Sequence, residues 1–551
     1  MKSRISFFDK TVIRKDLTRF LPLWLVYFIG GTLVMLVSTI ESRPETLARS
    51  MGVYIAAFGF INLVYALLAA QLLFGDLYHS RLCNAMHAMP LRRETWFFSH
   101  AASGILMSLV PNAVGILVTV PVLGRYWYAA FFWLLGMEMH YLFFFGVAVF
   151  CVLCTGSRFA GVTIYGIINF FVLIVQWLLD TIYVPLLYGV VSDMETLWIF
   201  CPVVNLIYGA EDGYFRFKWI SDGVSDHSAL RFVGLGEQFL YLTIIMAIGI
   251  GFGALALMLY RRRRLETAGD FMAVDFLKPV FAVIYTLCVG AVFAFLGDAM
   301  DAFLAFLIVG LLLGWFTAQM LLQRTVKVLH KKTLRGLLAF GLAMVLSMGI
   351  TWLDPMGISR YVPKAEEVKA VDMSWAGYMK PNEAQLEKVL QIHNAILQDG
   401  KAPSENCIYM NITYTLTDGR QVQRQYTVGR ETASIMEPLK ELANMPETVM
   451  GYGEYPDWET FKKRISAVVI YGDIHNTVYG EEADALMEAI KADCENGTMG
   501  QQSVISGGNG DYCYDLQLMF RDGSYGNSII VYSKSVNTVR WLKENTWVDE
   551  K

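Results

Sequence analysis

The chain has 551 residues, of which 55% are hydrophobic and 17% charged, and its mean hydropathy is +0.42. These values exclude an ordinary soluble protein, in which about 25% of residues are charged. The net charge of −4 gives no overall positive field, so nucleic-acid binding is not expected. The eight cysteines are scattered without metal-ligand spacing, so no metal site is expected either.

Long apolar runs dominate the first part of the chain. A helix needs about 20 apolar residues to cross the hydrocarbon core of a bilayer, which is about 30 Å thick. Nine runs meet this requirement, at residues 21–40, 51–74, 101–122, 128–154, 159–179, 239–260, 279–296, 302–322 and 337–353. The sequence therefore predicts a polytopic α-helical membrane protein with nine spans.

The Lys and Arg residues between these runs predict the orientation. With the N-terminus in the cytoplasm, twenty of them fall in cytoplasmic segments and six in exterior segments. Positive side chains are enriched on the cytoplasmic side of membrane proteins. We therefore expect a multi-pass protein of the plasma membrane, with a cytoplasmic N-terminus and an extracellular region after residue 353.

Residues 354–551 form a different kind of segment, because charged and turn residues become frequent and apolar residues alternate. Two parts of it look alike: a strand and a helix recur at an offset of 97 residues, and a hairpin with an Asp-Gly turn recurs at an offset of 104. The turns are Asp418-Gly419 and Asp522-Gly523. The pattern predicts a soluble α+β domain of two βαββα repeats, at about 365–445 and 462–546.

The segment between the second and third runs predicts a short amphipathic helix. Tyr78, Leu82 and Met89 share one face at helical spacing, and Pro90 ends the helix. A helix lying flat on the inner leaflet would have the same pattern, so the pattern alone leaves its role open.

The order of Asp76, this helix and the stretch Met-Pro-Leu-Arg-Arg at 89–93 resembles the permease subunits of ABC-2-type exporters, Gram-positive type. In that family the helix couples the permease to a separate ATPase. The resemblance implies this role for Asp76, Arg81, Pro90 and Arg93, and the apolar face adds Tyr78, Leu82 and Met89. His100 departs from the family, many of whose members have Lys there.

Three more stretches resemble this family. Residues 1–20 are amphipathic, as in the family's elbow helix, although an ordinary positive flank would look the same. Residues 197–208 are too short to span and contain Pro202 and Asn205. They resemble a re-entrant outer gate, and a surface helix is the alternative. The arginine run at 261–264 resembles the end of the sixth span, which implies a six-span core at 21–265, three additional spans at 266–353, and an appended extracellular domain at 354–551.

Glu138 and His140 interrupt the fourth apolar run, where an ionisable group is costly unless it faces protein or water. Two residues apart on a helix, they point about 200° away from each other. They cannot share one partner, so each has its own environment. Glu138 has a structural role in one interpretation, and in the other both residues line a transport path.

The sequence contains no phosphate-binding G-x-x-x-x-G-K-[ST] motif and no metalloprotease or serine-hydrolase motif, so no catalytic residue and no cofactor is expected in this chain. The resemblance implies alternating-access export of a hydrophobic or peptide-like substrate. The implied partners are a separate ATPase that binds ATP-Mg, a second permease subunit, and the lipid bilayer. A membrane-anchored sensor whose extracellular domain recognises a ligand is an alternative, and a membrane enzyme is disfavoured by the missing motifs.

Overall fold

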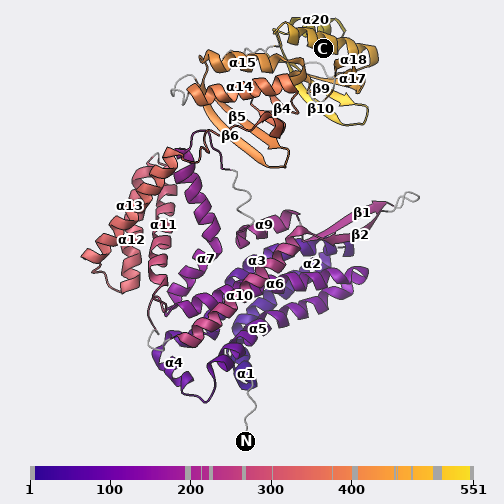
Figure 1. Cartoon of the computed structure of the whole chain (residues 1–551). Helices are drawn as coiled ribbons and strands as arrows, with labels where there is room; N and C mark the ends of the chain where they lie inside the picture. The colour runs from indigo at the N-terminus through magenta and orange to yellow at the C-terminus, as the bar shows by residue number, and fades with distance from the viewer. Residues whose placement is uncertain are drawn as a thin grey trace. The chain divides into compact units, whose positions relative to one another are not determined.

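The computed structural model describes residues 7–41, 43–192, 200–212, 214–221, 228–263, 269–300, 302–374, 376–399, 407–451, 455, 457–472, 476–499 and 512–545. The chain divides into two compact units (Figure 1). The first comprises Met1–Leu179 and Met194–Met344, and the second comprises Asp180–Asp193 and Val345–Lys551. A segment from between two membrane helices therefore belongs to the same unit as the C-terminal region.

A long helix lies over each apolar run that the sequence predicts. These helices are α2 (Leu21–Glu41), α3 (Pro44–Leu73), α5 (Arg93–Leu123), α6 (Trp127–Cys154), α7 (Arg158–Leu178), α10 (Glu237–Arg262), α11 (Leu277–Asp298), α12 (Phe303–Gln323) and α13 (Lys331–Leu353). Every backbone N–H and C=O in hydrocarbon must be bonded within the chain, which is why these apolar runs form continuous helices.

Seven helical stretches in the described part of the chain have the length and composition of a membrane span, or eight if the bent pair α1 and α2 is counted. One of the seven is Arg93–Cys154, which is 62 residues long and contains both α5 and α6. A 3-10 turn at Gly124–Tyr126 separates these two helices, and the Tyr141 hydroxyl donates to the Gly104 carbonyl across them at 2.8 Å. The chain is a multi-span helical membrane protein.

Helix α6 lies at the centre of the first unit and packs against α3, α5, α7 and α10. Its contact with α10 is close, because a Cβ atom on Gly146 would lie 2.0 Å from the Gly249 carbonyl oxygen. Glycine pairs allow helix backbones to approach in this way in membranes, where packing replaces the hydrophobic effect as the force between helices. Helices α11 and α12 pack on each other, and α11 also contacts α7.

Short elements flank these helices at two places. Helix α1 (Lys10–Arg19) is bent by 66° from α2, and the Asp9 carboxylate caps its first turn. It covers part of the predicted elbow helix, of which residues 1–6 lie outside the described ranges. Between α3 and α5 lie the 3-10 turn η1 (Gly75–Tyr78) and α4 (Ser80–His87), so the predicted amphipathic segment is a turn followed by a helix.

The connection from α7 to α10 contains more structure than the sequence predicts. A π-helical turn (Leu179–Tyr183) and a 3-10 turn (Val184–Leu186) follow α7. Helix α9 (Pro202–Asp212) begins at Pro202, so this proline starts a helix, while residues 197–199 of the expected gate lie outside the described residues. Strands β1 (Phe215–Ser221) and β2 (Ser228–Leu235) form an unpredicted antiparallel hairpin.

The second unit contains two antiparallel four-stranded sheets with the same topology, ordered β4-β3-β5-β6 and β8-β7-β9-β10. Helices α14 and α15 pack side by side on the first sheet, and α18 and α20 do so on the second (Figure 1). The elements of the first are β3 (Val368–Met373), β4 (Gly377–Met379), α14 (Glu383–Asp399), β5 (Cys407–Leu416), β6 (Gln421–Gly429) and α15 (Ala433–Asn444). Those of the second are β7 (Ile465–Gly472), β8 (Asn476–Tyr479), α18 (Gly480–Glu495), β9 (Tyr512–Phe520), β10 (Tyr525–Tyr532) and α20 (Val536–Asn545).

Each half therefore has the order ββαββα, and the predicted βαββα unit was wrong in omitting the short strands β4 and β8. The pairing matches residue by residue. Val371 pairs with Tyr414 in the first half, and Val468 pairs with Leu518 in the second, at the predicted offsets of 97 and 104. The turn glycines Gly419 and Gly523 both have positive φ, +86° and +82°. Helices α16 (Pro446–Met450) and α17 (Trp458–Lys462) lie between the halves in sequence, and a 3-10 turn (Ala365–Glu367) precedes β3.

Candidate functional site

The connection between α3 and α5 exposes an apolar surface. Leu82 is 46% exposed and Met89 is 44% exposed, and Arg81 and Pro90 beside them are also exposed. Tyr78, which the sequence places on the same face, is only 6% exposed. It belongs to the 3-10 turn η1, whose periodicity differs from that of an α-helix, so its side chain turns into the protein. Tyr78 is therefore removed from the predicted contact surface.

Two arginines fix this connection to the ends of three membrane helices. The Arg263 guanidinium donates to the carbonyls of Val152 and Leu153 at 3.3 and 3.0 Å, and to the Leu77 carbonyl at 3.4 Å. It thus binds the last carbonyls of α6, which have no partner within the helix. The same group holds the turn η1 in place.

Arg93, the first residue of α5, does the same for α10. Its Nη1 donates to the carbonyls of Tyr260, Arg261 and Arg263, at 3.3, 3.2 and 3.1 Å. A cation at a helix C-terminus also interacts favourably with the helix dipole. Arg263 therefore joins η1, which precedes α4, to the end of α6, and Arg93 joins α5 to the end of α10.

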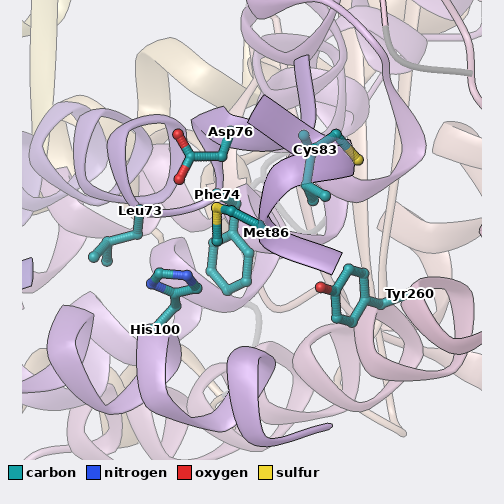
Figure 2. Close-up of a pocket in the computed structure, with 8 residues that line it drawn as sticks. Leu73, Phe74, Asp76, Cys83, Met86, His100 and Tyr260 are labelled. Carbon is teal, nitrogen blue, oxygen red and sulfur yellow. The ribbon is translucent and has the colours of Figure 1, made fainter. Parts of the chain in front are cut away.

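Asp76 and His100 line a small cavity beneath this surface, together with Leu73, Met86 and Tyr260 (Figure 2). Its volume is about 10 Å³, which holds about one water molecule and no larger ligand. Asp76, which is half-buried, pairs with the exposed Arg19 of α1 at 3.9 Å.

The His100 imidazole is engaged with the protein itself. Its Nδ1 lies 2.7 Å from the Asp16 carboxylate of α1, to which the Ser103 hydroxyl also donates at 3.0 Å. The ring stacks on Trp96 at 5.4 Å between centroids. His100 thus forms a buried contact between α5 and α1.

Glu138 and His140 face opposite surroundings in α6, as their spacing predicts. Glu138 Oε1 accepts from Ser108 and Asn112 of α5, at 3.0 and 2.8 Å. Asn112 is also bonded by the Tyr27 hydroxyl at 3.3 Å, which extends the network to α2. These hydrogen bonds between α6 and α5 are what a structural role requires.

His140 is 1% exposed, and its Nδ1 has no hydrogen-bond partner among the residues that the structure describes. Its ring meets Tyr214, just beyond α9, at 6.0 Å between centroids. Asn205 of α9 is also 1% exposed, and neither amide atom has a partner in the described ranges. Pro202 is half-buried at the start of the same helix.

Other polar groups of this region are buried without a partner in the described part of the chain, namely the Asn169 Oδ1 atom and the hydroxyls of Tyr214 and Tyr241. The Cys201 thiol donates to the Asn169 carbonyl at 3.5 Å, which places α9 directly against α7. Unbonded buried polar groups are costly and mark positions where water or a ligand binds. We call His140, Asn169, Asn205, Tyr214 and Tyr241 the polar cluster.

Most of the predicted site residues fall into two places, and Glu138 lies in neither of them. Arg81, Leu82, Met89, Pro90 and Arg93 belong to the α4 connection, while His140 and Asn205 belong to the polar cluster. The sequence patterns predicted no site role for Arg263, Asn169, Tyr214 or Tyr241. A lone Asn within the apolar run 159–179 was the available signal for Asn169.

Comparisons with known proteins identify no relative: no family model, no curated protein and no solved structure matches the chain. Within the described ranges, no group of three or more His, Cys, Asp and Glu side chains is placed to hold a metal ion.

Proposed function

We propose that this chain is the membrane permease subunit of an ATP-driven exporter of the ABC-2 type. The α4 connection carries the proposal: Arg81 and Leu82 of α4 and Met89 just after it are exposed. Arg263 bonds η1, at the start of this connection, to the end of α6, and Arg93 bonds α5 to the end of α10. An exposed apolar pair beside a cation suits contact with another protein, and the arginines would pass any displacement of α4 to α5, α6 and α10.

The proposed topology has nine spans. The seven candidate stretches become eight when α5 and α6 are counted separately, and α2 is the ninth. The excess of Lys and Arg supports an orientation in which α4 and the N-terminus are cytoplasmic and the two sheets of the second unit are extracellular. In this arrangement α4 faces the compartment that contains ATP. The ATP-Mg would bind to a separate ATPase subunit, and a second permease, identical or not, would complete the pathway.

The polar cluster is a suitable lining for the transport path. Its free donors and acceptors can bind water or polar groups of a passing hydrophobic or peptide-like substrate, and they lie beside α9, the proposed outer gate. Glu138 is assigned a structural role, because its oxygen is bonded to Ser108 and Asn112.

We also infer that the exterior domain arose by internal duplication. The observations that support this are the common strand order, the paired residues that recur at the predicted offsets of 97 and 104, and the matching Asp-Gly turns. Chance similarity would have to reproduce all of these together.

The decisive experiment uses Leu82→Asp, with Asn84→Asp as the matched control on an exposed position of the same helix. A charge at Leu82 should abolish co-purification of the ATPase and its vanadate-sensitive turnover, while both variants insert into the membrane normally. Asn84→Asp should behave as wild type. Equal ATPase recovery with both variants would contradict the α4 assignment, and the absence of any ATPase partner for wild type would favour the sensor alternative.

A further inference from the structure

Strand β6 lies at the edge of the first sheet, and a segment from far earlier in the chain occupies its outer edge. Val190 forms an antiparallel bridge with Arg424, and the Gln425 amide donates to the Gly189 carbonyl at 3.0 Å. Residues 184–190, which we call the strap, follow α7 in sequence and belong to the second compact unit. The strap thus extends the pairing of this sheet by one isolated β-bridge beyond β6.

The strap fits β6 through one aromatic side chain. Tyr188 packs against Tyr426 with 5.3 Å between ring centroids. Gly189 has φ +73°, and a Cβ atom there would lie 1.8 Å from Cε1 of Tyr426. Only glycine permits both the backbone conformation and the approach to the ring.

The Tyr426 ring is itself held by a buried hydrogen-bond chain. Its hydroxyl lies 2.8 Å from Nε2 of His393, and the other ring nitrogen of His393 lies 2.9 Å from the Tyr414 hydroxyl. None of these three residues is more than 1% exposed. These hydrogen bonds restrict the motion of the Tyr426 ring, so the surface that the strap contacts is preorganised.

The second repeat has none of these polar groups. The residues that correspond to His393, Tyr414 and Tyr426 in pairing and offset are Ile490, Leu518 and Val531. Their apolar side chains fill the same core without any specific bond. The polar trio is therefore unnecessary for the fold, and it occurs in the repeat that binds the strap.

A neighbouring residue of β6 binds the other segment that joins this unit to the membrane helices. Arg424 is 5% exposed, and its Nη2 donates to the carbonyls of Ile358 and Tyr361, at 2.8 and 3.3 Å. Ile358 and Tyr361 follow α13. The corresponding residue of β10 is Ile529, which cannot donate a hydrogen bond.

We propose that the first repeat is an anchor, and that β6 holds the C-terminal domain to the α7–α9 connection through the strap as well as to α13 through its linker. A change in this domain is then transmitted to the segment that leads into α9, without any new contact. The proposal concerns contacts within this chain and holds whichever partner drives the protein.

Hydrogen exchange of the full-length protein in detergent tests the anchor. Gly189→Ala should release the strap, and the amides of Gln425 and Val190 should exchange about tenfold faster or more. Gly377→Ala is the matched control, because Gly377 has φ +72° and no atom within 4 Å of a Cβ there. It should leave both amides protected. A Gln425 amide that is unprotected in wild type, or unchanged in Gly189→Ala, would overturn the proposal.

A disulfide test covers the case in which Gly189→Ala fails to fold. Val190 and Arg424 form a non-hydrogen-bonded pair, whose Cα atoms are about 4.5 Å apart in antiparallel sheets and within reach of a disulfide. In a background without Cys407, Cys494 and Cys513, Val190→Cys with Arg424→Cys should cross-link in membranes. Val190→Cys with Ser528→Cys, on the equivalent strand of the second repeat, should not. Equal cross-linking of the two pairs would contradict strap docking on β6.

Discussion

The two repeats of the C-terminal unit share a backbone and differ in where they bury polar groups. In the first, His393 and two tyrosines occupy the space between helix and sheet. In the second, that space is apolar, and the buried charge is Asp493, at the end of α18. The apolar periodicity and the turns therefore specify the shared topology. The buried polar groups differ because each repeat fixes a different segment of the chain.

The largest expected effect comes from Asp493. Its carboxylate is fully buried and accepts from the backbone N–H and side chain of Asn537 and Thr538, at 2.7 to 3.1 Å, and from Thr498 at 3.0 Å. Asp493→Ala leaves these donors unpaired and should lower the free energy of unfolding of the second repeat by about 3–5 kcal/mol. Exchange rates of β7 and β9 amides in the full-length protein measure this loss.

The matched control is Asp399→Ala. Asp399 accepts from Ser434 near the start of α15, but it is exposed, so water can replace it. Its removal should change the stability of the first repeat only slightly. Equal losses from the two variants would contradict the view that the second repeat depends on one buried carboxylate.

The second effect is a pH dependence of stability that is expected in the first repeat and not in the second. Burial, and to a lesser extent the charge of Arg424, lowers the pKa of His393 to about 4. The unfolded chain binds a proton near pH 6.5, whereas the folded repeat stays neutral until about pH 4. Acidification between these values should therefore destabilise the first repeat by about 3 kcal/mol, and no further loss from this residue follows below pH 4.

The slope of the first repeat's stability against pH is measured by hydrogen exchange of the β5 and β6 amides, corrected for the intrinsic pH dependence of exchange. His393→Gln should remove the slope, because glutamine does not titrate. The second repeat has Ile490 at this position and should not show it. A wild-type slope that persists in His393→Gln would show that other groups cause the acid sensitivity.

Much of the fold could be predicted from the sequence, because both hydrocarbon and sheet cores impose strict patterns. Each apolar run of sufficient length became a helix, and the offsets of 97 and 104 fixed the pairing of β3 with β5 and of β7 with β9. Strands β4 and β8 have only three and four residues, too few for a period-2 signal. The β1–β2 hairpin was missed although the alternation in Phe215–Ser221 was visible.

The candidate site was less predictable, since it depends on which helix ends meet. The spacing in sequence placed Leu82 and Met89 on the exposed face, but it misplaced Tyr78 because the phase changes between η1 and α4. The contacts of Arg263 with α6 carbonyls join residues about 110 positions apart, and no local pattern encodes them. The same holds for the strap, whose partner strand begins more than 200 residues later in the sequence.

The smallest effect should be the same in both repeats, because the hairpin turns are built alike. Asp418 Oδ1 accepts from the Arg420 amide at 3.0 Å, and Asp522 Oδ1 accepts from the Ser524 amide at 2.9 Å. Hydrogen bonds to the charged form lower the pKa of both carboxyls, so each contribution is present at neutral pH and is lost as the pH falls through the lowered pKa. Asp418→Ala and Asp522→Ala should cause small and nearly equal increases in amide exchange at their own turns.

Each of these aspartates also pairs with an arginine. Asp418 pairs with Arg420 within the turn at 2.6 Å, and Asp522 pairs with Arg464 from outside the turn at 2.7 Å. Because these ion pairs are exposed they add little, so a clearly larger effect at Asp522 would show that the contact with Arg464 breaks the equivalence of the repeats.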